Sequence, residues 1–273
     1  MSILIYLGLF FLGLCWGSFT NVLIERGQKN RSLRGRSKCD YCNYTLRWFD
    51  NIPVLSFVFL QGTCRKCKKK LSWQYPIVEF LTGLVFVLTF WLLNNSGIVE
   101  LKAFDSNFWL NLFYYLTVIY LLWVILLWDL KYMIIPDLLV AIGISATVLY
   151  KIYETLIEKS SLMSFDSAIL SALLGGVLLS GFFGIMFWFS KGKWIGGGDV
   201  KLGFWLGFLI GFKMVYFLIL LAYTSGAMVA IFLLIFFNKK MKSEIPFGPF
   251  LIVSTAVIIF YQDYIFRLWN YLI

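Results

Sequence analysis

Long apolar segments alternate with short polar ones along most of the chain. About 20 apolar residues of helix are needed to cross a bilayer, and most of these segments approach that length. We predict eight membrane-spanning helices, at about residues 3–24, 77–93, 108–128, 134–153, 167–190, 200–212, 214–237 and 246–265. The expected fold class is therefore an all-α polytopic membrane protein with about eight transmembrane helices.

Residues 25–76 are the one large polar interruption of this pattern. They divide the chain into a first transmembrane helix at 1–24, a loop domain at 25–76 and a membrane domain at 77–273. Within the loop, residues 46–57 are amphipathic and aromatic, which suits a segment lying on the membrane surface. No basic residues precede the first apolar segment and no small-residue cleavage site follows it, so we expect a retained helix and not a signal peptide.

Composition and charge agree with a membrane protein and orient it. Of the 273 residues, 60% are hydrophobic and 14% are charged, whereas soluble domains carry about 25% charged residues. The net charge is +10, and residues 25–76 contribute +9 of it, with twelve Lys and Arg against three acids. Such an excess marks the cytoplasmic side and attracts anionic lipid headgroups. Nucleic acid is the rival partner, but it is not expected because these basic residues are interleaved with cysteines and tied to spans.

The remaining basic residues fit a single topology. Lys131, Lys191 and Lys193, and the basic turn at 239–242, fall on the same side of the membrane as the basic loop. An eight-span chain that satisfies the positive-inside rule in this way has both termini outside. The third apolar segment therefore ends, and the sixth begins, at the cytoplasmic edge of the membrane.

Four of the five cysteines form two Cys-x-x-Cys pairs in the loop, Cys39 with Cys42 and Cys64 with Cys67. Thiolates paired and spaced in this way are typical of a tetrahedral zinc site. Disulfides are the alternative, and a reducing cytoplasm disfavours them. With four sulfur ligands the metal would stabilise the loop and would have no open position for chemistry. The fifth cysteine, Cys15, is expected to be buried in the first span.

The candidate catalytic residues are carboxylates, because the chain contains no histidine. This absence excludes a Ser-His-Asp triad, a Cys-His pair and an HExxH zinc site. Asp129 ends the third apolar segment, where the helix macrodipole disfavours negative charge, and Asp199 follows the glycines at 196–198. Two carboxylates that share a site can act as acid and base, as in aspartic proteases. Taken alone, the Gly-x-Gly-Asp tetrapeptide is equally compatible with an acidic helix N-cap.

Three further charged residues have open roles. Glu79 and Asp137 each lie near the start of a predicted helix, where the helix dipole stabilises an acid, and Glu79 is also a candidate functional residue. Lys201 is either a partner of the Asp199 carboxylate or an interfacial anchor, and the anchor is favoured. The small or polar residues that predict close helix packing are Gly17, Ser18, Asn21, Gly175, Gly176, Gly181 and Gly184.

Several short motifs follow one another in a fixed order along the chain. They are GSFTNV at 17–22, the two Cys-x-x-Cys pairs, DNIP at 50–53, YPIVE at 75–79, Asp129 followed by IPD at 135–137, GGGDVK at 196–201 and PFGPF at 246–250. With these motifs the chain resembles the bacterial type IV prepilin peptidases, which are GxGD-type intramembrane aspartic proteases. The chain departs from the family pattern at Arg26-Gly27, where many relatives have a proline soon after the arginine. This difference bears only on the backbone geometry at the start of the loop.

This resemblance implies that Asp129 and Asp199 are the catalytic aspartates. It implies cleavage of the basic leader of prepilins or pseudopilins after a glycine, at the cytoplasmic face of the bacterial inner membrane. It also implies N-methylation of the new terminal residue from S-adenosylmethionine, although no nucleotide-binding fingerprint is visible. Because the basic loop should repel a basic leader, we expect recognition to rest on the apolar prepilin helix and on acids such as Asp137 or Glu79. Oligomeric state and substrate pathway stay undefined by the sequence.

Two other classes of protein remain open at this point. A transporter or channel would use intramembrane carboxylates to relay protons or bind cations, and would place the acidic pair deep in the bilayer. A non-catalytic, zinc-bearing scaffold of an export machine would tolerate the loss of both aspartates but not of the cysteines. Loss of leader cleavage on replacing Asp129 or Asp199 separates the peptidase from both alternatives.

Overall fold

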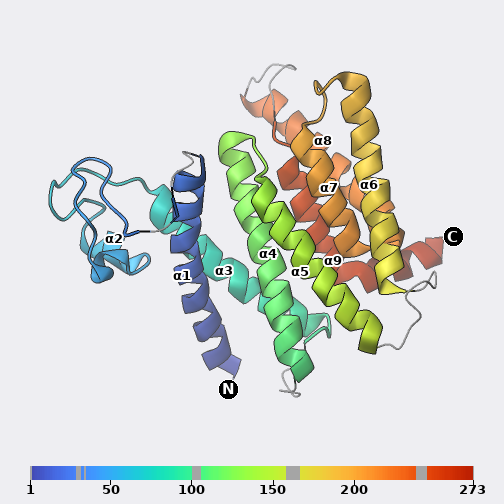
Figure 1. Ribbon diagram of the computed structural model, residues 1–273, viewed down its shortest axis with the longest axis horizontal. Helices are drawn as coiled ribbons and strands as arrows, with labels where there is room; N and C mark the ends of the chain where they lie inside the picture. Colours follow the sequence, from blue (N-terminus) through green and yellow to red (C-terminus); the bar gives the residue numbers. More distant parts are fainter. Residues whose placement is uncertain are drawn as a thin grey trace. The chain divides into compact units, whose positions relative to one another are not determined.

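The computed structural model describes residues 2–28, 32–33, 35–99, 106–157, 167–237 and 245–272. Within these ranges the structure consists of helices and loops, with two isolated β-bridges in the loops (Figure 1). The elements are α1 Ser2–Gln28, η1 Trp48–Asn51, α2 Leu55–Phe59, α3 Gln74–Asn95, α4 Ser106–Tyr132, α5 Asp137–Ile157, α6 Ala168–Ser190, α7 Gly197–Ile210, η2 Phe212–Met214, α8 Val215–Phe237 and α9 Gly248–Leu272.

Each of the eight predicted spans corresponds to one of these helices. Among the described residues, six helices are long and apolar enough to cross a membrane, and they cover 3–28, 74–95, 106–132, 137–157, 168–190 and 212–236. The other two are shorter, namely α7 with 14 residues and the apolar part of α9, Gly248–Gln262. The prediction of an all-α, multi-pass membrane protein is therefore confirmed.

Some details differ from the predicted pattern. The helix expected to end on Asp129 continues to Tyr132, and it stops where Met133 adopts φ 55° and donates its N–H to the Asp129 carbonyl at 2.8 Å. Cys15 is exposed on α1, so the prediction of a buried thiol is wrong. The predicted loop residues 100–105 and 158–166 and the basic turn 239–242 lie outside the described residues.

The chain forms two compact units, residues 1–116 and 117–273. The three-part division expected from the sequence stays a prediction. In the first unit α1 packs closely on α3, because Gly13 and Gly17 lie one helical turn apart on the same face of α1. A Cβ added to Gly17 would lie 2.6 Å from the Glu79 Cα, and one added to Gly13 would lie 2.8 Å from the Gly83 Cα. Small residues therefore let the two backbones touch, as predicted for Gly17.

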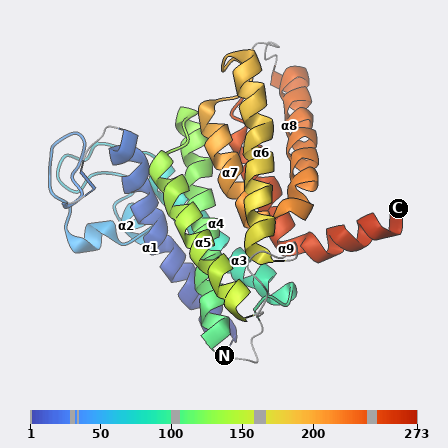
Figure 2. The same ribbon diagram turned by 45° about the vertical axis from the view of Figure 1, so that its right-hand side comes forward.

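In the second unit α7 is held between α5 and α6, and Figures 1 and 2 show α6 and α7 side by side. A Cβ on Gly175 of α6 would lie 2.4 Å from the Gly207 carbonyl oxygen of α7, so the two helices meet backbone to backbone. On the other side, Trp205 packs against Gly143 of α5 and donates its indole N–H to Thr147 at 3.0 Å. These contacts fix the position of α7 and hence of Asp199 near its start.

Candidate functional site

Asp129 is a buried carboxylate in the last turn of α4, with 5% of its surface exposed. Its Oδ2 atom has no hydrogen-bond partner among the described residues. The backbone of Gly248, the first residue of α9, lies directly against it, and the Gly248 amide acts electrostatically on the carboxylate. An unpaired polar atom in a buried position is costly, so this oxygen needs an explanation beyond packing.

Asp199 lies in the first turn of α7 and is partly exposed. Gly196 is the N-cap residue, and its N–H donates to Asp199 Oδ2 at 3.1 Å, while the Asp199 N–H donates to the Gly196 carbonyl at 3.1 Å. The alternative in which Asp199 is the N-cap is therefore wrong, because the carboxylate sits three residues inside the helix and reaches back. Only one of its oxygens is used in this bond.

The two aspartates lie close enough for the Asp129 charge to act on the Asp199 carboxylate. Both residues belong to the second unit, although they are seventy positions apart in the sequence. The Asp199 charge also acts on Tyr223 of α8, whose hydroxyl contacts the Met186 sulfur at 3.3 Å. Sequence reasoning missed Tyr223, because nothing distinguishes one tyrosine within an apolar span from the others.

Lys201 does not pair with Asp199. Its Nζ lies 2.8 Å from both carboxylate oxygens of Asp137, the first residue of α5, and both side chains are exposed. An exposed ion pair of this kind contributes at most about 1 kcal/mol, so it orients the start of α7 more than it stabilises it. Gly198 lets the start of α7 pack closely against the residues before α5, because a Cβ at this position would lie 3.1 Å from the Ile135 Cβ.

The four loop cysteines form one cluster, and all four Sγ atoms lie within 4.8 Å of one another. Two copies of the same turn build it. In each turn the residue after the second cysteine has positive φ, Asn43 at 54° and Lys68 at 56°, and donates its N–H to the carbonyl of the first cysteine at 2.9 and 3.0 Å. Short antiparallel bridges flank the two turns, Lys38 with Thr45 and Thr63 with Lys70.

The cluster fits a zinc ion. Tetrahedral coordination with Zn–S distances of about 2.3 Å separates the sulfurs by about 3.8 Å, and the Cys39–Cys67 and Cys42–Cys64 pairs are each 3.9 Å apart. The backbone N–H of Cys67 lowers the pKa of the Cys64 thiol to about 7, whereas burial and the neighbouring thiols raise the pKa of Cys42 to about 11. Without metal, the thiolate therefore forms first at Cys64. All four cysteines predicted as ligands are therefore gathered in one site.

Glu79 joins the loop to the helices of the first unit. Its carboxylate is 9% exposed and accepts the Val54 N–H at 2.7 Å. Val54 has φ 59°, a conformation that a β-branched residue adopts only under strain. Glu79 therefore stabilises an unfavourable turn in the loop, and it is not merely an acid placed at a helix start.

Comparison with known proteins gives the family. Residues 11–93 match the sequence profile of the bacterial peptidase A24 N-terminal domain, and residues 116–231 match that of the type IV leader peptidase family. A prepilin leader peptidase/N-methyltransferase of Vibrio cholerae serotype O1 is 29% identical over 271 residues, which is 94% of this chain and 97% of that protein. The chain therefore belongs to the type IV leader peptidase family.

Other relatives carry the same name. The protein of Aeromonas hydrophila is 28% identical over 232 residues, or 85% of this chain and 73% of that protein. That of Myxococcus xanthus is 51% identical over 79 residues, which cover 29% of this chain and 24% of the relative. No solved structure matches the chain.

Proposed function

We propose that this protein is an intramembrane aspartic endopeptidase that cleaves the leader of type IV prepilins or pseudopilins, with Asp129 and Asp199 as its catalytic pair. The observation that carries the proposal is the meeting of two carboxylates from separate helices, one of them with a buried, unpartnered oxygen. Membership of the leader peptidase family and the names of the relatives support the choice of substrate.

The chemistry follows from the shared site. Two neighbouring carboxylates cannot both ionise freely, so one keeps a proton while the other accepts a proton from water. The activated water attacks the scissile carbonyl carbon, and the protonated aspartate donates to the carbonyl oxygen. As the tetrahedral intermediate collapses, the C–N bond breaks and the leaving amine takes up a proton from the pair. The burial of Asp129 strengthens these electrostatic interactions.

Two features bear on where the leader lies. We infer that the active site faces the cytoplasm of a bacterial inner membrane, because the basic loop and the ends of α4 and α7 fall on one side of the predicted topology. The basic loop repels a basic leader and rests against anionic lipid headgroups. Asp137 is paired with Lys201, so a basic leader side chain must compete with that lysine for it.

We also propose that the chain methylates the new N-terminal residue of the cleaved substrate with S-adenosylmethionine as donor, as the second half of the relatives' names suggests. Zinc bound by the four cysteines holds the loop together and takes no part in either reaction. The donor, when bound, supplies an electrophilic methyl group.

The full chain in nanodiscs, incubated with a synthetic prepilin and labelled S-adenosylmethionine, tests both activities in one mass spectrum. The expected products are the free leader, ending in glycine, and a mature peptide heavier by one labelled methyl group. An intact prepilin after prolonged incubation, with protein that retains its zinc and its fold, contradicts the peptidase. A mature peptide without the label contradicts the methyltransferase alone.

A further inference from the structure

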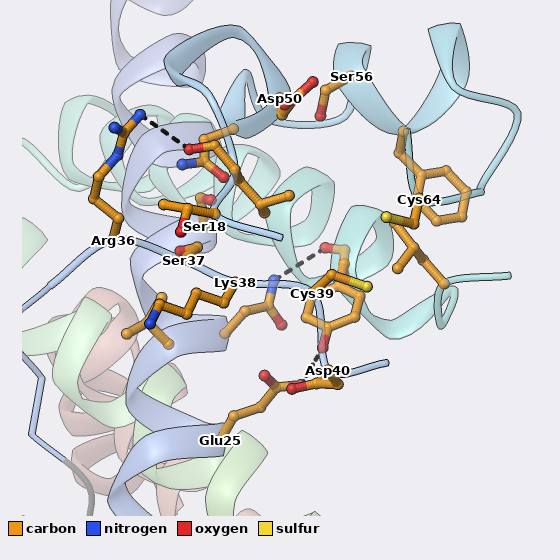
Figure 3. A pocket seen from close by; sticks show the side chains of 18 of the residues that line it. Ser18, Glu25, Arg36, Ser37, Lys38, Cys39, Asp40, Asp50, Ser56 and Cys64 are labelled. Carbon is orange, nitrogen blue, oxygen red and sulfur yellow. Dashed lines mark hydrogen bonds between the residues drawn. The ribbon is translucent and has the colours of Figure 1, made fainter. Parts of the chain in front are cut away.

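The first unit contains a pocket of about 710 Å³ between α1, the start of α3 and the cysteine loop. Figure 3 shows Ser18 and Glu25 on the α1 side of it and Asp40, Asp50 and Cys64 on the loop side. Its volume lies in the range of pockets that bury small-molecule ligands, about 300–1,000 Å³. The catalytic aspartates proposed above belong to the second unit and do not line it.

One wall of the pocket carries an unsatisfied polar atom. Asn21 is 3% exposed and donates its Nδ2 to the Tyr75 carbonyl at 3.2 Å, but its Oδ1 has no hydrogen-bond partner among the described residues. Buried side-chain oxygens are nearly always paired, because an unpaired one costs about 1–3 kcal/mol. Asn21 therefore offers an acceptor to a ligand that carries a hydrogen-bond donor.

Four acidic and four basic residues line the pocket. Two of the acids, Glu25 and Glu79, form no ion pair within the part of the chain that the structure describes. Glu25 accepts a hydrogen bond from the Tyr75 hydroxyl, which keeps its carboxylate in place. Each of these two carboxylates is a local partner for a positively charged group of a ligand.

Three of the four basic residues that line the pocket, the arginines, have other partners. Arg26 donates to the backbone carbonyls of Ser32, Leu33, Gly35 and Arg36, and Arg36 donates to the Leu46 carbonyl. Arg65 pairs with Asp50 at 2.8 Å, and Lys38 is exposed. The three arginines hold the loop in shape, and none of them forms an ion pair with Glu25 or Glu79 among the described residues.

The two family profiles divide the chain in a way that matches the two activities in the relatives' names. The leader peptidase profile, at 116–231, includes both aspartates, whereas the N-terminal profile, at 11–93, includes the whole pocket. We propose that this pocket binds the sulfonium methyl donor, with Asn21 accepting a hydrogen bond from it, and that Glu79 accepts the proton released on methyl transfer. The inference rests on the proposed methyltransferase activity and locates its site.

The transfer balances with these groups. The lone pair of the neutral substrate amine forms the new N–C bond to the methyl carbon, and the C–S bond breaks with its electron pair remaining on sulfur. The sulfonium becomes a neutral thioether, and the nitrogen becomes a methylated ammonium. That ammonium gives one proton to the Glu79 carboxylate, which is held in place by the Val54 N–H at 2.7 Å.

Three variants of the full chain in nanodiscs test the site. Binding of tritiated S-adenosylmethionine and methylation of a synthetic peptide that already has the mature N-terminus are measured together, so the methyl transfer is independent of the peptidase. Asn21→Leu should weaken donor binding at least about tenfold, and Glu79→Gln should slow methylation at least about tenfold. Glu154→Gln, the control in the other unit, removes a carboxylate that pairs with Lys151 and does not line the pocket, so it should bind and methylate like the wild type.

The same variant distinguishes a proton-accepting role of Glu79 from a purely structural one. Glutamine keeps the acceptor for the Val54 N–H, so a role confined to holding the loop predicts wild-type methylation by Glu79→Gln. Zinc content and prepilin cleavage by the same samples report whether each variant is folded. Wild-type binding by Asn21→Leu together with wild-type methylation by Glu79→Gln overturns the proposal.

A second measurement needs no variant. A photoreactive azido derivative of S-adenosylmethionine is crosslinked to the wild-type chain and the labelled peptide is identified. Crosslinks within residues 18–79 are expected, and crosslinks confined to residues 117–273 overturn the site while leaving the methyltransferase intact. A wild-type protein that cleaves prepilin but never methylates refutes the proposed second activity itself.

Discussion

Asp129 and Gly248 are in direct contact, so close that a Cβ on residue 248 would lie 2.5 Å from Asp129 Oδ2. Gly248 is the first residue of α9, and its amide belongs to the positive end of that helix dipole. A glycine here lets the helix end approach the buried carboxylate. The PFGPF motif at 246–250 thus has a physical role beside Asp129, one of the two aspartates proposed to be catalytic.

Replacing Gly248 by alanine should therefore displace Asp129 and slow prepilin cleavage about 10²-fold, since a misplacement of about 1 Å has that effect on catalysis. The measurement is the cleavage rate of a synthetic prepilin by purified protein. Gly226→Ala is the matched control, because a Cβ there meets Phe250 at an ordinary 3.6 Å. Equal rates for the two variants would show that the contact with Asp129 is dispensable.

The backbone contact between α6 and α7 makes a prediction about stability. Gly175→Ala places a methyl group 2.4 Å from the Gly207 carbonyl oxygen and forces the two helices apart. We expect the free energy of unfolding to fall by about 1–3 kcal/mol. Gly181→Ala, in the same helix with nothing within 4 Å, should be neutral or slightly stabilising. Thermal unfolding in detergent compares them, and equal midpoints would refute the close packing.

Zinc binding is tested by metal analysis of the purified protein. The wild type should contain about one zinc per chain, and replacing Cys39 and Cys64 together by serine should abolish it, because two of the four ligands are lost. Cys15→Ser is the control, since that thiol is exposed on α1 and outside the cluster. Equal zinc content in the double variant and the control would refute zinc binding by the four cysteines.

The two cysteine turns differ at one strained position, and the difference can be measured. Asn43 suits its φ of 54°, whereas Lys68 occupies the equivalent position at 56° with a long side chain that disfavours it. Lys68→Asn should stabilise the zinc-bound loop by about 0.5–1 kcal/mol, seen as a higher chelator concentration needed to remove zinc. Lys66→Asn removes the same charge at a position without positive φ, and an equal gain there would assign the effect to charge.

The sequence predicted the fold well because apolar segments and helices coincide. It also predicted the cysteine cluster, since that rests on two local motifs, whereas the catalytic aspartate pair stays a prediction. What it missed depends on tertiary contacts. The exposure of Cys15, the pairing of Lys201 with Asp137 and the unsatisfied Asn21 oxygen are set by which helix faces meet. A polar residue in a span hinted at a role for Asn21, but only the packing of α1 showed that its oxygen lacks a partner.

The central claim is that Asp129 and Asp199 carry out leader cleavage. The most direct measurement is the cleavage rate of a synthetic prepilin by Asp129→Asn and by Asp199→Asn, each folded, zinc-bound and inserted in nanodiscs. Asparagine keeps the shape of the side chain and removes its ability to exchange a proton, so each rate should fall at least about 10²-fold. Glu154→Gln, which removes a carboxylate of the same unit that pairs with Lys151, should cleave like the wild type. Cleavage at the wild-type rate by either aspartate variant would contradict the account.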